Sequence, residues 1–207
     1  GVMLNGVVLA DPVFVQSLVK ALGDVKLQDG KVLTGKSTAE YLLNTVYKDH
    51  ALDDTDGVFS AVAKDCVNRL MKGEGARALA SLAKNLPTLA RYRHFNVYSF
   101  NKSLETVFTE LGLTANVPRD SVKPQLGIYI TEKNPSKVGW YIERSTTVKQ
   151  TNCESSGPAT YHVEYTLTNM LTEEEKEELS SYVTGDWGAY PDRGGSGMET
   201  IIFYPPA

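Results

Sequence analysis

The chain of 207 residues is 42% hydrophobic, which is enough to bury one good core or two small ones. Its net charge of −4 and the scatter of its 21 Lys and Arg leave no basic stripe, which argues against nucleic acid as a partner. No apolar run reaches the roughly 18 residues that span a bilayer, and there is no signal-peptide leader. Because the sequence opens on Gly1 without an initiator Met, we expect any leader or membrane anchor to lie upstream of Gly1.

The first predicted elements are a strand and a helix. The run Val7–Leu9 is apolar without polar alternation, which predicts a buried strand. Asp11 is a preferred N-cap and Pro12 is favoured at the first helical position, so a helix should begin there. Apolar residues then recur every four positions until Gly23, which predicts a left-handed C-terminal cap.

The next stretch, Val25–His50, supports two incompatible interpretations. In the preferred one, two short β-prone runs flank Asp29 and Gly30, a dipeptide typical of hairpin turns. Ser37 and Glu40 then have the spacing of a capping box, which predicts a helix starting at Ser37. Four apolar residues at spacings of three and four would form the buried face of that helix: Leu42, Leu43, Val46 and Tyr47.

The alternative interpretation is a nucleotide site. The pattern G-x-x-x-x-G-K-S/T of phosphate-binding loops is matched by Gly30, Gly35, Lys36 and Ser37. However, Val32 and Leu33 would place apolar side chains in the segment that should wrap the anion. No apolar run ending in a magnesium-binding Asp follows the motif either. The sequence therefore favours a hairpin that leads into a capped helix.

The segment Asp49–Asp56 is acidic but lacks carboxylates at the first and twelfth positions of a calcium loop, so we predict that it caps a helix and binds no metal. A double apolar stripe from Val58 to Met71 predicts that helix, ending at Gly73. Cys66 falls on its apolar face, and Cys153 lies in the other half of the chain. We therefore expect two separate thiols, the first of them buried.

A shorter helix should run from Ala76 to Leu86 and stop at Pro87. Arg91 and Arg93 follow among aromatic residues. Basic residues interleaved with aromatics can bind polynucleotide or glycan, although a short run is also typical of a strand with long side chains lying over apolar neighbours. A strand at 96–100 and a helix at 104–111, closed by Gly112, complete this half.

The polar stretch Thr114–Lys123 separates a helix-rich half from one with strand periodicity, so we predict domains at residues 1–115 and 116–207. Alternating strands without intervening helices predict a small antiparallel β-sandwich in the second domain. Thr172 should cap a short solvated helix. Trp187 and Tyr190 lie in a Gly-rich loop, where they could stack on a sugar or pack over the end of the sandwich. The predicted class of the whole chain is α+β.

No motif in the sequence carries a catalytic nucleophile. There is no G-x-S-x-G elbow, no H-E-x-x-H and no Cys-x-x-Cys. His50, His94 and His162 lie on three different predicted elements. The sequence thus identifies no catalytic residue and no cofactor.

Several segments resemble a domain of unknown function, numbered 4012, from membrane-anchored cell-surface proteins of actinobacteria. In the first half the segments are Gly6–Pro12, Leu18–Asp24, Asp29–Gly30 and Ala39–Tyr47, and in the second half they are Val138–Ile142, Tyr165–Asn169 and Tyr182–Gly185. The resemblance implies an extracytoplasmic location at the cell surface.

The first seventy residues are also distantly similar to the carboxyl half of the LytR-CpsA-Psr domain, an α/β enzyme that transfers lipid-linked glycopolymers. The paired arginines of that family, which bind pyrophosphate, align with Leu43 and Thr45, and its later Asp-x-x-Arg aligns with Asp56 and Phe59. The similarity implies an α/β fold for the first domain. Without bidentate donors to the pyrophosphate, it does not imply the transferase activity.

Three hypotheses follow. The first is a non-catalytic extracytoplasmic domain pair that binds or scaffolds in the cell envelope, with cell-wall glycan or another envelope protein as partner and membrane contact only through an upstream anchor. Its candidate binding residues are Arg91, Arg93, Trp187 and Tyr190. The second is a glycopolymer transferase relative that uses other residues. The third is a cytoplasmic phosphate-loop nucleotide binder.

Overall fold

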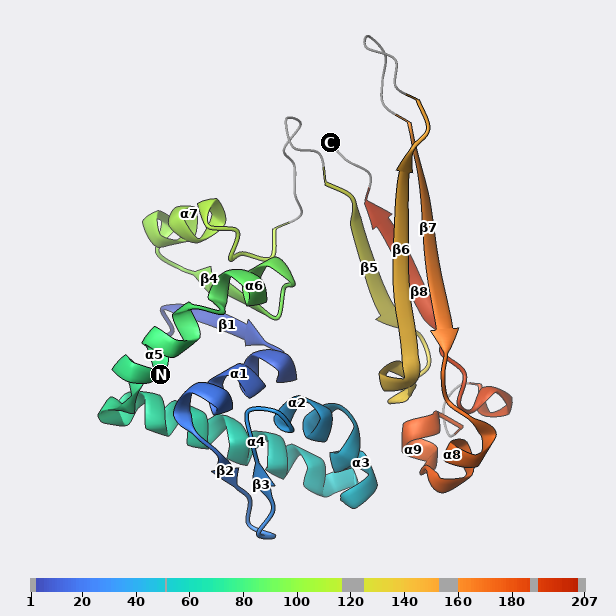
Figure 1. Cartoon of the computed structure of the whole chain (residues 1–207), viewed down its shortest axis with the longest axis horizontal. Helices are drawn as coiled ribbons and strands as arrows, with labels where there is room; N and C mark the ends of the chain where they lie inside the picture. Colours follow the sequence, from blue (N-terminus) through green and yellow to red (C-terminus); the bar gives the residue numbers. More distant parts are fainter. Residues whose placement is uncertain (1–2, 51, 117–124, 153–159, 187–189, 205–207) are drawn as a thin grey trace. The chain divides into compact units, whose positions relative to one another are not determined.

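The computed structural model describes residues 3–50, 52–116, 125–152, 160–186 and 190–204. Helices are mixed with small antiparallel sheets, so the predicted α+β class is confirmed. The chain divides into two compact units (Figure 1). Unit 1 comprises Gly1–Gly127 with Tyr204–Ala207, and unit 2 comprises Ile128–Phe203. Among the described residues, no helix combines the length and the apolar character needed to cross a membrane.

Unit 1 begins with strand β1 (Gly6–Ala10) and helix α1 (Pro12–Leu22). The predicted N-cap is confirmed, because the Asp11 carboxylate accepts hydrogen bonds of 2.9 Å from the N–H groups of Val13 and Phe14. Gly23 ends the helix with a positive φ of 98°, but its ψ of 167° is extended, so the predicted left-handed cap was wrong in detail. The guanidinium of Arg69 instead binds the carbonyls at the end of α1.

The predicted hairpin is confirmed, with β2 (Val25–Lys26) antiparallel to β3 (Val32–Leu33). The Leu27 N–H donates to the carbonyl of Lys31, and the Gly30 N–H donates to the carbonyl of Leu27. Gly30 has a φ of 89°, the conformation in which a glycine completes a loop of this kind.

The helix after the hairpin begins after Ser37, which occupies the predicted N-cap position, but the capping box between Ser37 and Glu40 was wrong. Ser37 makes no side-chain cap to the next turn. Instead, the N–H of Thr34 donates to Ser37 Oγ at 3.0 Å, and the N–H of Lys36 donates to Thr34 Oγ1 at 3.3 Å. Thr34 and Ser37 therefore hold the turn that leads into the helix through reciprocal side-chain bonds. The helix continues as α2 (Thr38–Glu40), a π-helical segment η1 (Tyr41–Thr45) and α3 (Val46–Asp49).

The next helix also runs further than predicted. It comprises α4 (Leu52–Arg69), a π-helical segment η2 (Leu70–Glu74) and α5 (Gly75–Ala83), so the predicted end at Gly73 was wrong. Cys66 before that glycine and Ala78 after it are buried in the same core cluster, and packing on both sides outweighs the low helix propensity of glycine. Pro87 then lies in the first turn of α6 (Leu86–Arg91) rather than stopping a helix.

Among the residues that the structure describes, two clusters of buried apolar side chains stabilise unit 1. The larger one joins α1, the hairpin and the following helices: Val19, Leu22, Val25, Leu27, Leu33, Tyr41, Leu42, Val46, Val62, Cys66 and Ala78. The smaller one contains Leu82, Leu89 and Phe95. The rings of Phe14 and Phe95 lie 4.9 Å apart, so this second cluster ties α1 to the start of β4.

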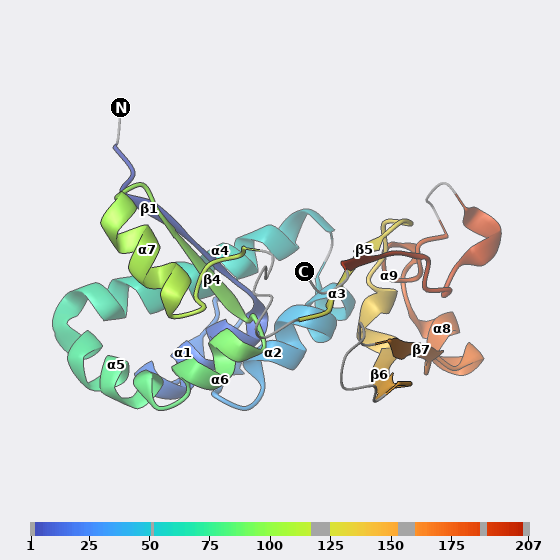
Figure 2. The same ribbon diagram turned by 90° about the horizontal axis from the view of Figure 1, so that it is seen from above.

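Strand β4 (Phe95–Ser99) pairs with β1 in an antiparallel sheet, followed by α7 (Lys102–Glu110) beside it (Figure 2). The two strand pairs in the described residues of unit 1 are antiparallel, whereas the α/β organisation expected for residues 1–115 is built on parallel strands. The predicted burial of Val7–Leu9 was wrong. Val8 and Leu9 point to opposite faces of the sheet and are 60% and 59% exposed, so the other described elements leave much of both faces of β1 uncovered.

Unit 2 contains two separate ribbons, so the predicted β-sandwich was wrong for the described residues. Strand β5 (Gly127–Glu132) pairs with β8 (Glu199–Tyr204), and β6 (Ile142–Gln150) pairs antiparallel with β7 (Tyr161–Asn169). A sandwich buries one face of each sheet, but β6 is exposed beyond its first residue. An ion pair between Arg144 on β6 and Glu199 on β8 joins the ribbons.

The remaining elements of unit 2 are short: η3 (Val138–Tyr141), α8 (Glu173–Glu178), α9 (Ser181–Thr184) and η4 (Pro191–Arg193). Thr172 caps α8 in a capping box with Glu175, as predicted. The interior of this unit is partly polar. Asn134 is 1% exposed, and its Nδ2 donates to the carbonyl of Gly185 at 3.0 Å.

Candidate functional site

The candidate binding site of unit 1 is an apolar groove with a volume of about 580 Å³, within the range typical of small-molecule sites. It lies between the end of α5, helix α6, the start of β4 and the turn after α7. The described residues of its walls are mostly aliphatic and include one cation: Ala83, Leu86, Pro87, Ala90, Arg91, Phe95, Leu111, Gly112 and Leu113. We call it the α6–α7 groove.

Both walls of this groove are formed by segments whose start or turn is specified by a local residue in the sequence. Pro87 starts α6, which presents Leu86 and Ala90 on one side. On the other side, Gly112 has a φ of 70°, which lets the chain turn back after α7. The N–H of Leu113 donates to the Phe108 carbonyl at 2.8 Å, and its own carbonyl accepts from Val97 of β4 at 2.9 Å. These bonds hold Leu113 against the sheet.

The structure brings Arg91 to the groove but directs Arg93 elsewhere. Arg91 is exposed, and its guanidinium carbon lies 5.9 Å from the ring centre of Tyr92. Arg93 has a φ of 58°, and its Nη1 donates to the carbonyl of Thr114 at 3.4 Å. The neighbouring His94 binds the capping carboxylate of Asp11, with 2.7 Å between Nδ1 and Oδ2. Of the two predicted arginines, Arg91 is therefore among the described residues that line the α6–α7 groove, and Arg93 is not.

A second cavity of about 410 Å³ lies beside the hairpin, and sequence patterns did not reveal it. It is lined by Leu27, Gln28, Asp29, His50, Asp54, Gly57, Val58 and Ala61. The His50 Nε2 lies 3.0 Å from the Tyr41 hydroxyl and 3.9 Å from the Asp29 carboxylate. These residues are far apart in the sequence and meet because the hairpin turn folds onto the junction of α3 and α4.

The electrostatics of this second cavity are set by its neighbours. Lys31 forms an ion pair with Asp49, and its ammonium lies 4.7 Å from the ring centre of Tyr41. The hydrogen bond to Asp49 raises the pKa of Lys31, while burial raises the pKa of the Tyr41 hydroxyl. Lysine and tyrosine thus stay protonated, and the Tyr41 hydroxyl serves as a neutral partner of His50.

The motif of Gly30, Gly35, Lys36 and Ser37 does not form an open cradle. The N–H groups of Ser37 and Thr38 donate to the Thr34 carbonyl, and the N–H of Ala39 donates to the Gln16 side chain. A phosphate loop needs those amides free for its anion. Gly35 packs against Lys20, and Lys36 is exposed. The geometry therefore favours the hairpin interpretation over the nucleotide site.

The other predicted positions belong to other parts of the chain. Tyr190 is 37% exposed in unit 2, and Trp187 lies outside the described residues, as does Cys153. Cys66 is buried as predicted. Within the described ranges, no group of three His, Cys, Asp or Glu could hold a metal ion. Of the positions aligned with the transferase arginines, Phe59 stacks with Tyr47 at 6.3 Å between ring centres.

Residues 1–47 match a family described as "Protein of unknown function (DUF4012)". The match spans β1 through the beginning of α3 and supports the predicted family for that segment. No curated protein and no solved structure matches the chain. The actinobacterial origin and the likeness to LytR-CpsA-Psr domains stay predictions.

Proposed function

We propose that this chain is a non-catalytic binding and scaffolding domain pair of the cell envelope, outside the cytoplasm, and that unit 1 holds its ligand in the α6–α7 groove. The observation that carries the proposal is the groove itself, an apolar cavity whose described wall includes the cation of Arg91. Concave apolar sites with a few convergent polar groups are typical of ligand binding.

The residues that line the groove indicate which chemical class of ligand fits it. The side chains of Leu86, Leu111 and Leu113 offer apolar contact, which suits an aliphatic chain better than the hydroxyl-rich surface of a bare glycan. Arg91 supplies one guanidinium, which suits one anionic group. The ligand is thus the apolar part of an envelope component that carries an anionic head, either a lipid or an acylated partner.

The location in the envelope is proposed from the resemblance described above, and the match over residues 1–47 supports that family for this segment. The non-catalytic assignment rests on the lack of a nucleophile motif in the sequence and on the chemistry of the groove lining, where Arg91 is the ionisable residue among those that the structure describes. A protein that binds without reacting needs affinity and shape rather than an acid–base pair.

Calorimetric titration with decanoate tests the proposed ligand class. We expect binding of decanoate and weaker binding of decanol, which has the same chain without the charge. Arg91→Gln should weaken decanoate binding about fivefold, since an exposed ion pair contributes about 1 kcal/mol. Decanol binding should not change in this variant.

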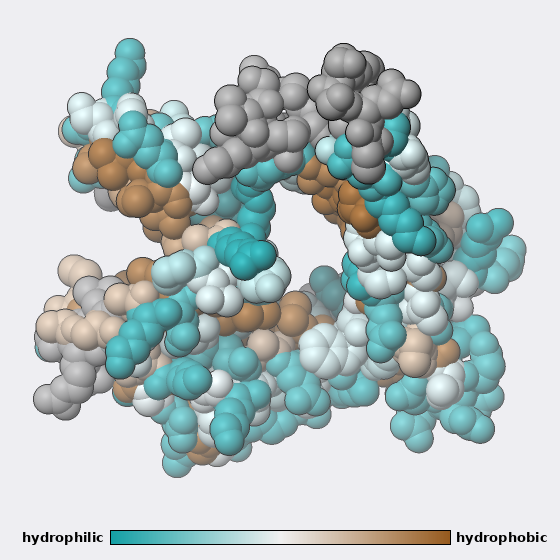
Figure 3. Space-filling model, turned by 45° about the horizontal axis from the view of Figure 1, so that its top comes forward, coloured by the Kyte–Doolittle hydropathy of each residue, from teal (hydrophilic) through white to brown (hydrophobic). Residues whose placement is uncertain are grey.

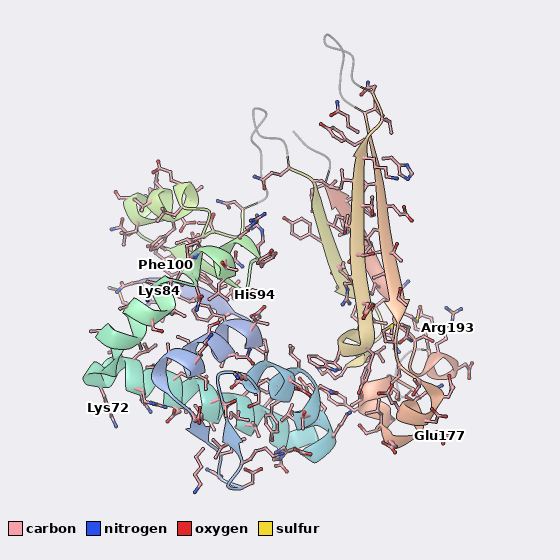
Figure 4. All side chains as sticks on the ribbon, in the orientation of Figure 1. Lys72, Lys84, His94, Phe100, Glu177 and Arg193 are labelled. Atoms are coloured by element: carbon pink, nitrogen blue, oxygen red, sulfur yellow. The ribbon has the colours of Figure 1, made fainter. Side chains whose placement is uncertain are left out.

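Lys72→Gln is the matched control, because Lys72 is an exposed cation on η2, well apart from His94 and Phe100 in Figure 4. It should bind decanoate like the unmodified protein. Ala90→Glu should abolish decanoate binding by placing a carboxylate in the groove wall. Equal affinity of all variants for decanoate, or no binding by the unmodified protein, would remove the α6–α7 groove from the proposal.

The location is tested separately by protease accessibility in intact cells that produce the natural protein. Digestion of this chain by added protease, with a cytoplasmic marker left intact, is the expected result. Protection in intact cells and digestion after lysis would contradict an extracytoplasmic location.

A further inference from the structure

The cavity beside the hairpin is formed by two segments that are distant in the sequence. One wall is a single face of α4, where spacings of three and four place these residues side by side: Asp54, Gly57, Val58 and Ala61. The hairpin contributes Leu27, Gln28 and Asp29, and His50 lines the cavity as well. Its volume of about 410 Å³ is within the range typical of small-molecule sites.

Gly57 leaves the α4 wall of this cavity open. A Cβ at this position would meet nothing within 4 Å, so open space begins at the backbone of the helix. Glycine destabilises a helix relative to alanine, and close packing against a described neighbour does not account for it here. Because Gly57 shares its helix face with Asp54 and Ala61, any larger side chain would project from the wall of the cavity.

The described lining carries two formal negative charges, on Asp29 and Asp54. Asp29 Oδ1 accepts the Lys31 N–H at 3.0 Å, and its Oδ2 lies 3.9 Å from His50 Nε2. The ammonium of Lys31 forms an ion pair with Asp49. Among the described residues, none forms a hydrogen bond or an ion pair with the Asp54 carboxylate. The cavity therefore offers negative charge that a cationic ligand would balance.

The same cavity has an aliphatic part, supplied by Leu27, Val58 and Ala61. Figure 3 shows mostly hydrophilic side chains, in teal, over the lower part of unit 1, where Figure 1 places the hairpin. A metal ion would need several oxygen ligands, and in the described ranges no group of three His, Cys, Asp or Glu could hold one. Carboxylates beside aliphatic side chains instead fit a ligand with a cationic head and an apolar body.

We propose that the cavity beside the hairpin binds an aliphatic ammonium ion. The ammonium group donates hydrogen bonds to the carboxylates of Asp54 and Asp29, and the hydrocarbon chain lies against Leu27 and Val58. This site shares none of its described lining residues with the α6–α7 groove, and it takes a ligand of the opposite charge. It therefore goes beyond the function proposed above.

Calorimetric titration of the whole chain with hexylamine and hexanol at pH 7 tests this proposal. The two probes share a six-carbon chain, but hexylamine is a cation at this pH and hexanol is neutral. We expect hexylamine to bind more tightly than hexanol. Asp54→Asn should weaken hexylamine binding about fivefold, the usual size of an exposed charge pair, and leave hexanol binding unchanged.

Asp56→Asn is the matched control, because Asp56 is an exposed carboxylate of the same helix that lies outside the described lining of the cavity. It removes the same charge and should bind hexylamine like the unmodified protein. Gly57→Leu should abolish the binding of hexylamine by filling the cavity, with an unchanged circular dichroism spectrum.

The comparison of Asp54→Asn with Asp56→Asn decides the matter independently of Gly57→Leu. Equal affinities of these two variants for hexylamine would overturn the proposal, since the charge of the whole protein would then explain the binding. The same conclusion would follow if the unmodified protein bound hexylamine no more tightly than hexanol, or if folded Gly57→Leu bound hexylamine normally.

Discussion

Gly35 lies so close to α1 that a side chain at this position would clash with it. A Cβ there would be 2.5 Å from Lys20 Cβ and 2.6 Å from Lys20 Cα. We expect Gly35→Ala to lower the free energy of unfolding by about 1–3 kcal/mol, since the backbone of α1 would have to move. Urea denaturation measures this change. The glycine is thus explained by packing rather than by anion binding.

Gly57 provides the control for that measurement. It lies within α4, and a Cβ there would meet nothing within 4 Å. Gly57→Ala should therefore raise the free energy of unfolding by about 1 kcal/mol through helix propensity. If both substitutions changed stability in the same direction, the close contact between Gly35 and Lys20 would be contradicted.

Cys66 should be unreactive in the folded protein. Its side chain is buried, and burial raises the pKa of the thiol above its ordinary value of 9.0. In a Cys153→Ser background, we expect Ellman's reagent at pH 8 to modify Cys66 no faster than the protein unfolds. Rapid modification without added denaturant would contradict its burial.

The same pKa shift predicts how stability depends on pH. Because the folded thiol holds its proton more tightly than the unfolded one, its contribution is fully present below pH 9.0 and is lost as pH rises through the folded pKa. The free energy of unfolding should therefore fall more steeply above pH 9 in the protein with Cys66 than in Cys66→Ala. Parallel pH profiles would disprove this assignment.

At the scale of elements, substitutions at the start of the helix after the hairpin test which side chains stabilise that start. The Ser37 hydroxyl accepts from the Thr34 N–H, whereas Glu40 is exposed one turn later. We expect Ser37→Ala to lower the free energy of unfolding by about 1 kcal/mol and Glu40→Ala to leave it nearly unchanged. A larger effect of Glu40→Ala would instead restore the capping box predicted from the sequence.

Strand β1 shows why an element can be predicted while its environment is not. An apolar run without alternation predicts a strand, and β1 is one. The same pattern predicts burial on both faces, but burial depends on which elements lie over the strand. Among the described residues, β1 has β4 as its sheet partner and remains largely exposed. A local pattern specifies conformation, whereas burial is set by contacts distant in the sequence.

At the scale of the whole molecule, the two units differ in how they are stabilised. Both clusters of buried apolar residues found in the described part of the chain lie in unit 1. The interior of unit 2 includes the amide of Asn134, whose Oδ1 is buried without a partner. An unsatisfied buried acceptor costs free energy, so unit 2 should be the less stable unit.

This difference predicts two separate transitions in urea. Both tryptophans of the sequence, Trp140 and Trp187, belong to unit 2, so fluorescence reports its unfolding. Most helices belong to unit 1, so circular dichroism at 222 nm reports mainly that unit. We expect the fluorescence midpoint at lower urea concentration. Coincident midpoints would show that the units unfold together.

The sequence by itself determined the elements whose signals lie within a few residues of one another. These elements include the cap at Asp11, the turn at Asp29 and Gly30, and the cap at Thr172. Each depends on hydrogen bonds between residues within a single turn of the chain, so the residue types alone suffice to predict it. The α+β class followed from the spacing of the apolar residues.

The tertiary structure alone decided which surfaces are covered and which residues meet. Helix continues through Gly73 because core packing holds both sides of it, and Arg91 rather than Arg93 lines the α6–α7 groove because the chain turns at Arg93. Likewise, Tyr41, His50 and Asp29 form one cluster only after the hairpin folds onto α4. The physical reason is the separation in sequence of the residues that interact. The hydrogen bonds of a turn join residues that are close in the sequence, whereas buried cores and cavities form between segments that are far apart in it.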